Sequence, residues 1–124
     1  LHTSYAARNS KRLLLMRFLD CVDRRDGKDA ANLFLPDAVW STASPLGDIQ
    51  GIENIQILID TKLQSRKYGP SYLRHRMQST ADMDDLTVIT PTGERCRFNM
   101  EIETLYKGNQ STMMIRKLVR KTLP

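Results

Sequence analysis

Apolar residues recur at helical spacing through the first half of the chain. Between residues 11 and 25 they fall three or four positions apart and form one arc. The members of this arc are Leu15, Phe18, Leu19 and Val22. Gly27 is expected to end this first helix, because glycine is frequent just past a helix C-terminus. A second short helix is predicted at residues 29–35, where Pro36 stops it, and a third runs from residue 51 to about residue 67.

The spacing changes to an alternation of period two in the second half, which is typical of half-buried strands. Strands are predicted at residues 38–42, 72–78, 86–90, 95–106 and 112–122. The strand at 95–106 alternates most clearly, with one side made of Cys96, Phe98 and Met100 and the other of Arg97, Asn99 and Glu101. On the strand at 72–78, Leu73, His75 and Met77 share one face. Turns are expected at residues 44–48, 82–85, 91–93 and 107–111.

Helices followed by a run of strands predict an α+β fold in a single domain, residues 1–124. A chain of this length buries a core without needing a disulfide or a metal. The three helices are expected to cover one face of a curved antiparallel sheet and to leave a pocket between the layers. Cys21 and Cys96 are interpreted as free buried thiols, and a disulfide between them is the alternative.

The net charge of +5 is unevenly distributed along the chain. Residues 1–103 hold 14 basic and 14 acidic side chains. The final residues carry basic groups only, at Lys107, Arg116, Lys117, Arg120 and Lys121. We interpret these as the solvated face of an edge strand, and an anionic partner is the alternative. Nucleic acid is disfavoured as a partner, because no aromatic platform accompanies the charge.

Several classes of protein are disfavoured by what the sequence lacks. No apolar run reaches the ~20 residues that span a bilayer, and no signal-peptide pattern is visible, so a cytoplasmic protein without a membrane partner is expected. No glycine-rich phosphate loop and no metal-ligand spacing occur, so any chemistry is expected to use neither cofactor nor metal. The acidic run Asp82, Asp84 and Asp85 is interpreted as a solvated turn, with a cation site as the alternative.

Asp23 and His75 are the candidates for acid–base chemistry. His75 shares its predicted strand face with Leu73 and Met77, which points its imidazole toward the interior, and an imidazole transfers protons well near neutral pH. The alternative is a core histidine bonded to backbone groups. Asp23 lies at the border of the apolar arc, where a carboxylate close to a helix C-terminus is electrostatically unfavourable. A solvated residue at the helix end is the alternative for Asp23.

Four stretches resemble the SnoaL-like branch of the nuclear transport factor 2-like superfamily. They are FLDCVDRRDG at residues 18–27, ANLFLPDAVW at 31–40, GIENI at 51–55 and LRH at 73–75. The resemblance extends over roughly residues 10–106. It implies a cone-shaped α+β barrel with a deep apolar pocket and a homodimer formed through the outer face of the sheet.

Within the superfamily, the site pattern is similar to that of scytalone and bile-acid dehydratases, in which an aspartate and a histidine act inside the pocket. Asp23 and His75 stand at the matching positions. A further polar residue on a later strand is usual, and Arg97, Asn99 or Glu101 is the candidate here. The resemblance and the strand alternation together predict a substrate pocket shaped by Phe18, Trp40, Met77, Phe98 and Met100.

Ketosteroid isomerase activity is disfavoured by the same comparison. Phe18 stands where those isomerases carry a tyrosine donor, and Thr42 stands where they carry the basic aspartate. The sequence thus predicts a cofactor-independent lyase or isomerase, dehydratase-like or cyclase-like, that binds a hydrophobic small molecule. The alternative is a non-catalytic small-molecule-binding or dimerisation module of the same fold.

Overall fold

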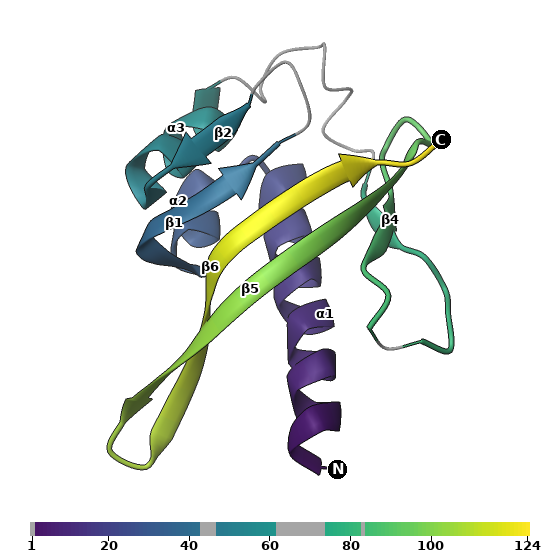
Figure 1. Ribbon diagram of the computed structural model, residues 1–124. Coiled ribbons are helices and arrows are strands. Elements are labelled where there is room, and N and C mark those ends of the chain that lie inside the picture. Colours follow the sequence, from purple (N-terminus) through teal and green to yellow (C-terminus); the bar gives the residue numbers. More distant parts are fainter. Residues whose placement is uncertain (1, 43–46, 62–73, 83) are drawn as a thin grey trace.

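The computed structural model describes residues 2–42, 47–61, 74–82 and 84–124. Three helices precede most of the strands, in an α+β arrangement (Figure 1). The helices are α1 (His2–Asp23), α2 (Gly27–Ala31) and α3 (Ile52–Thr61). The strands are β1 (Phe34–Ser41), β2 (Asp48–Gln50), β3 (Arg76–Met77), β4 (Thr87–Ile89), β5 (Arg95–Lys107) and β6 (Gln110–Thr122).

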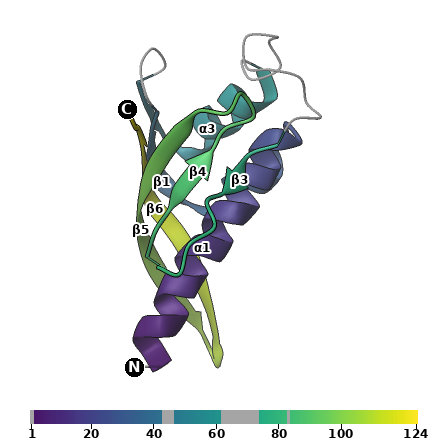
Figure 2. The same ribbon diagram turned by 90° about the vertical axis from the view of Figure 1, so that its right-hand side faces the viewer.

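The strands form one curved sheet in the order β2-β1-β6-β5-β4-β3. β1 and β6 run parallel and the other neighbours are antiparallel, so the sheet is mixed, although mostly antiparallel as predicted. β2 and β3 are the two edges, and the sheet is open rather than closed into a barrel. All three helices lie on one side of the sheet, as expected (Figure 2).

The core forms between α1 and the inner face of the sheet, which is the face that meets the helices. The predicted arc of α1 is buried, and so are the apolar alternating positions of β5 and the centre of β6. The fully buried side chains include Leu15, Phe18, Phe34, Ile55, Ile59, Val88, Cys96, Ile115 and Leu118. The alternation predicted for β5 is confirmed: Cys96, Phe98 and Met100 are buried, whereas Arg97, Asn99 and Glu101 are exposed.

Both ends of α1 differ from the prediction. The helix begins at His2 rather than at residue 11, and it ends at Asp23 because Arg25 adopts a left-handed conformation with φ of 59°. The amides of Arg25 and Asp26 then donate to the carbonyls of Val22 and Cys21, which satisfies the last carbonyls of the helix. Arg25, not Gly27, is therefore the residue that terminates α1.

Gly27 begins α2 instead of ending α1. It lies at the point where α2 and α3 approach each other closely. A Cβ atom on Gly27 would lie 2.5 Å from Asp60 Oδ1 and from the Gln56 carbonyl oxygen. The Gly27 amide donates to Asp60 Oδ1 over 2.7 Å, and Asp26 caps α2 by accepting from the Asp29 amide. The glycine is thus required by packing rather than by a turn.

The predicted helix at residues 29–35 was wrong in its second half. α2 ends at Ala31, and Phe34 already belongs to β1, which includes Pro36. The pairing of β1 with β6 shifts register between Phe34 and Val39, and the exposed Pro36 lies in that irregular stretch, where a missing amide costs no ladder bond.

Other boundaries also changed. β2 was not predicted, and β3 is limited to Arg76 and Met77, so that His75 precedes the strand. The remaining strands and the hairpin turns lie close to their predicted positions. Leu73, and the predicted extension of the third helix beyond residue 61, fall outside the described residues.

Candidate active site

The burial of Asp23 follows from its place in α1. It is the last residue of the helix and directly follows Val22, whose side chain is in the core. Only 2% of Asp23 is exposed. An ionised carboxylate at this depth must be hydrogen-bonded, and the carbonyls at a helix C-terminus make its position still less favourable. The structure supplies the necessary donors from a distant part of the chain.

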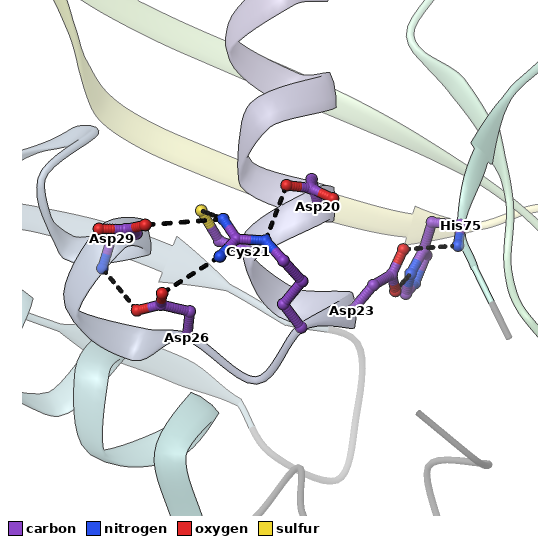
Figure 3. A network of polar contacts seen from close by, with 7 residues as sticks. Asp20, Cys21, Asp23, Asp26, Asp29 and His75 are labelled. Carbon is purple, nitrogen blue, oxygen red and sulfur yellow. Dashed lines mark hydrogen bonds and ion pairs between the residues drawn. The ribbon is translucent and has the colours of Figure 1, made fainter. Parts of the chain in front are cut away.

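His75 provides both of those donors. Its Nδ1 lies 2.6 Å from Asp23 Oδ1, and its backbone amide donates to Asp23 Oδ2 over 2.8 Å (Figure 3). The two residues are 52 positions apart in sequence. Each carboxylate oxygen therefore has its own partner, and the two bonds fix both the backbone and the ring of His75. The meeting of carboxylate and imidazole that the sequence predicted is present.

This arrangement determines how the imidazole can react. An ionised carboxylate only accepts hydrogen bonds, so opposite an ionised Asp23 the ring would hold its proton on Nδ1. Nε2 is then the ring nitrogen with a lone pair, and it can take up a proton while the carboxylate stabilises the resulting imidazolium. The His75 side chain is 17% exposed, so the pair is protected from bulk water without being sealed.

A second group of acids lies beside this pair and does not include it. Arg24 forms ion pairs with Asp20, Asp26 and Asp29, at 2.9, 3.2 and 3.6 Å (Figure 3). Arg24 also lies 3.6 Å from the Cys21 sulfur. Burial raises the pKa of the Cys21 thiol, which keeps it protonated. These groups surround the turn between α1 and α2 at the surface.

The predicted pocket residues occupy two places. Phe18 and Trp40 are core residues whose rings meet edge to face, with centroids 5.1 Å apart. Phe98 and Met100 line a cavity of about 350 Å³, and Met77 packs at the border of the core. The cavity is also lined by Lys11, Asp84, Leu86, Arg97 and Asn99. Neither Asp23 nor His75 is among its lining residues.

The candidates for a third polar group are also separated. Arg97 and Asn99 line the cavity of about 350 Å³, whereas Glu101 does not line it and pairs in register with Lys117. Trp40 has an indole Nε1 that is buried and has no hydrogen-bond partner among the described residues. The same is true of Arg120 Nε.

The position of Arg120 corrects an interpretation of the basic C-terminal segment. β6 lies between β1 and β5, so it is not an edge strand. Arg120 pairs in register with Phe98, and paired residues share a face, so Arg120 is on the inner face of the sheet. Arg120 is two positions after the apolar Leu118, and residues two apart on a strand share a face. This spacing was the signal in the sequence that could have placed Arg120 on the inner face, where Leu118 is buried.

Further observations concern the cysteines, the acidic run, metal ligands and membrane spans. Both cysteines are free and buried, which confirms that prediction. Asp85 accepts hydrogen bonds from the amide and hydroxyl of Thr87, and Asp82 accepts from the Asp84 amide. Within the described residues, no cluster of three or more potential metal ligands is found. None of the described helices combines the length and the apolar character needed to cross a membrane.

Comparison with known proteins identifies the fold. No family model and no curated protein matches the chain. Among solved structures, the crystal structure of LinA is similar, with a TM-score of 0.68 and 17% identity over 98% of this chain and 88% of that chain. A LinA-type3 hexachlorocyclohexane dehydrochlorinase from Novosphingobium barchaimii LL02 has a TM-score of 0.66 and 17% identity, over 96% and 88%.

A nuclear transport factor 2-like superfamily protein from Salmonella enterica serovar Typhimurium LT2 is also similar. Its TM-score is 0.64 at 12% identity, over 96% of this chain and 92% of that chain. The chain therefore has the nuclear transport factor 2-like fold. At these identities the likeness is one of fold, and the site has to be argued from its own residues.

Proposed function

We propose that this chain is a cofactor-independent lyase that eliminates a leaving group from a hydrophobic small molecule by acid–base chemistry. The observation that carries the proposal is the buried Asp23 carboxylate, which binds both the ring and the backbone amide of His75. A carboxylate–imidazole pair that fixes the ring and leaves Nε2 as the acceptor is a suitable general base. Support also comes from the similar fold of a hexachlorocyclohexane dehydrochlorinase, which is a lyase by its name.

The proposed reaction step starts from a His75 ring that holds its proton on Nδ1, opposite Asp23 Oδ1. His75 Nε2 takes a proton from a substrate carbon adjacent to the one that bears the leaving group. The electrons of the broken C–H bond form a carbon–carbon double bond, and the leaving group departs with the electrons of its own bond. Asp23 stabilises the imidazolium until its proton is passed to water or to the leaving group.

The substrate is proposed to be apolar over the part that meets Leu86, Phe98 and Met100, while charged and polar side chains line the rest of the cavity. Phe98 and Met100 are apolar walls of the cavity of about 350 Å³, which is a volume suited to a small molecule. Phe18 and Trp40 belong to the hydrophobic core and Met77 packs against it, and none of the three lines this cavity. The proposal places the chain near the SnoaL-like dehydratases and cyclases. An isomerase would use the same base and return the proton to another carbon.

The test is turnover of a panel of apolar cyclic chlorides and alcohols, such as chlorocyclohexane, followed by chloride release and alkene formation. His75→Ala and Asp23→Asn are expected to lower the rate by roughly 10²- to 10⁴-fold, the usual contribution of a general base. Asp20→Asn is the matched control, because Asp20 is an exposed carboxylate on the same helix, paired with Arg24. A wild-type rate in His75→Ala would contradict the proposal.

A binding module without catalysis is the second candidate, and one observation favours it. Neither Asp23 nor His75 lines the cavity of about 350 Å³. In this case the wild-type chain would turn over no member of the panel but would still bind its apolar members. The fluorescence of Trp40, the chain's single tryptophan, reports such binding, and sedimentation equilibrium measures whether the chain dimerises.

A further inference from the structure

The cavity of about 350 Å³ lies at the edge of β5, where the pairing of this strand with β4 ends. β5 has 13 residues and β4 has 3, so β5 continues well beyond its neighbour (Figure 1). The Phe98 amide donates to the Leu86 carbonyl over 3.1 Å, next to the last paired residues. Four consecutive residues of β5, from Arg97 to Met100, line the cavity. Because consecutive strand residues point to opposite faces, the cavity lies along the edge of the strand rather than over one face.

The lining of this cavity divides into an apolar floor and a polar rim. The floor is formed by buried side chains of the hydrophobic core, namely Leu86, Phe98 and Met100. The rim is formed by side chains that reach solvent, namely Lys11, Asp84, Arg97 and Asn99. An apolar floor under a polar rim is complementary to a small molecule that has an apolar body and one polar end.

The rim carries more positive than negative charge. Lys11 and Arg97 are cations, and Asp84 is the one acid among the lining residues. Within the part of the chain that the structure describes, neither cation takes part in an ion pair. A guanidinium carries five N–H donors, and the long contact from Arg97 Nε to the Thr87 hydroxyl, at 3.5 Å, uses one of them. The cations of the rim therefore retain donors for a ligand.

Asp85 is an acid that competes for Arg97, but its hydrogen bonds are directed elsewhere. Its Oδ1 accepts from both the amide and the hydroxyl of Thr87. These hydrogen bonds and, to a smaller extent, the charge of Arg97 lower the pKa of Asp85. The two charges thus attract each other without forming an ion pair. The charge of Arg97 is only partly compensated within the protein.

We propose that this cavity binds the substrate through a carboxylate, which the Arg97 guanidinium and the Lys11 ammonium hold at the rim while its apolar body lies on the floor. The planar fork of a guanidinium matches a carboxylate, and charge strengthens both sets of hydrogen bonds. Asp84 repels further negative charge, which favours a single carboxylate over a dianion. The inference rests on the proposed function, because it names the substrate class of that reaction, the apolar monocarboxylates.

Binding is tested by NMR of the chain labelled with carbon-13 in its methionine methyl groups. Cyclohexanecarboxylate is the probe, and cyclohexanecarboxamide is its neutral match in size and shape. The carboxylate is expected to shift the Met100 methyl signal along a saturable curve. The signal of Met16, an exposed residue of α1 outside the cavity, should stay in place. The carboxamide should bind at least about tenfold more weakly, because it loses the charge-assisted hydrogen bonds.

Two further probes examine the floor and the charge of the rim. Acetate has the carboxylate without the apolar body, and cyclohexyl phosphate has the body with a dianion. Both should bind more weakly than cyclohexanecarboxylate. Equal affinities of the carboxylate and the carboxamide, or a Met100 signal that does not respond, would overturn the inference. Acetate that binds as tightly would remove the role of the floor, and tighter binding of the phosphate would contradict the choice of a carboxylate.

Variants of the rim separate a defined site from a general attraction of anions to a basic protein. Arg97→Gln and Lys11→Gln should each weaken the binding of cyclohexanecarboxylate at least about fivefold. Lys121→Gln is the matched control, because Lys121 pairs in register with Arg97 but does not line the cavity. Its affinity should stay within about twofold of the wild type in physiological salt, where exposed charges are screened. Equal losses in the Lys121 and Arg97 variants would overturn the site.

A conservative variant guards against effects on folding. Circular dichroism verifies the fold of each protein, and if Arg97→Gln does not fold, Arg97→Lys replaces it. Lysine keeps the charge but lacks the planar fork, so the carboxylate should bind several-fold more weakly than in the wild type. An unchanged affinity in Arg97→Lys would mean that charge alone, rather than the guanidinium geometry, selects the carboxylate, which would contradict the role given to Arg97.

Turnover separates this inference from the proposed function. Chlorocyclohexanecarboxylate, with chlorine opposite the carboxylate on the ring, would yield cyclohexenecarboxylate, chloride and a proton. Its KM should rise at least about fivefold in Arg97→Gln and stay unchanged in Lys121→Gln. His75→Ala should bind cyclohexanecarboxylate as the wild type does, because His75 does not line the cavity. Carboxylate binding without any turnover would refute the proposed function alone, whereas His75-dependent turnover without a Met100 response would refute this inference alone.

Discussion

Two sets of charged contacts lie near the end of α1, and they differ in burial and in how far apart in sequence their members are. Arg24 and its partners Asp20, Asp26 and Asp29 keep between 35% and 59% of their side-chain surfaces exposed. Asp23 keeps only 3% of its side-chain surface exposed, and its partner comes from 52 residues further along the chain. Both groups are visible in Figure 3.

The two groups differ in what their ion pairs are expected to contribute to stability. Exposed ion pairs contribute little, because water and salt screen them. A buried carboxylate is costly to desolvate, and replacing such a pair by apolar residues is often neutral or stabilising. The buried pair is therefore poor evidence for a purely stabilising role, which agrees with the acid–base role proposed for it.

The largest expected effect comes from breaking the buried pair. In Asp23→Ala, the backbone amide and ring of His75 lose their acceptor while they remain in a protected site. We expect a loss of about 2–4 kcal/mol in the free energy of unfolding, measured by urea denaturation. Asp20→Ala is the control, and its change should lie within the error of the measurement. Similar losses in the two variants would remove the distinction between the groups.

The contact between α2 and α3 gives the next largest effect. Gly27→Ala would place a Cβ atom 2.5 Å from two oxygen atoms of α3, so the two helices must separate. Overpacking of this kind costs about 1–3 kcal/mol in the free energy of unfolding, and urea denaturation measures it. Lys28→Ala, at an exposed position of the same helix, serves as the control. An unchanged free energy of unfolding in Gly27→Ala would mean that the contact between α2 and α3 does not require a glycine.

Asp85 represents an intermediate case between the buried and the exposed acids. Hydrogen bonds from the Thr87 hydroxyl and amide, with help from Arg97 and Arg12, lower the pKa of Asp85. Its stabilisation is therefore complete above the unfolded-state pKa and is lost as the pH falls through the lower, folded-state value. Asp85→Asn should cost about 1 kcal/mol in urea denaturation at pH 7, and less at pH 3. A loss of unfolding free energy in Asp85→Asn that is larger at pH 3 than at pH 7 would contradict this prediction.

The smallest effect is expected at Arg24. Arg24→Gln removes exposed ion pairs only, so the melting temperature should change little. Any difference from the wild type should narrow further in 1 M sodium chloride, where the Debye length is about 3 Å. Thermal denaturation at low and high salt measures both quantities. A large, salt-independent loss would show that this network, too, has a structural role.

The sequence predicted those features that depend on local periodicity. The arc from Leu15 to Val22 and the alternation of Cys96, Phe98 and Met100 identified the buried faces of α1 and β5. The proximity of Asp23 and His75 was also predicted, although it relied on a family resemblance in addition to the residue pattern.

Features set by contacts between distant segments were missed. Pro36 stands in a strand because β1 shifts register there, which no local pattern reveals. The strand that carries Arg120 was interpreted as an edge strand because the sequence does not show that β6 is flanked by β1. The role of Gly27 depends on Asp60, which belongs to another helix. In each case the decisive neighbour is remote in sequence.

The central claim is that Asp23 fixes the His75 ring so that Nε2 is the nitrogen that accepts a proton. Nitrogen-15 NMR of the labelled imidazole, recorded at a pH where the ring is neutral, tests it most directly. We predict a ring protonated at Nδ1 and unprotonated at Nε2, and a loss of this preference in Asp23→Asn. A neutral ring that carries its proton on Nε2 in the wild type would contradict the claim.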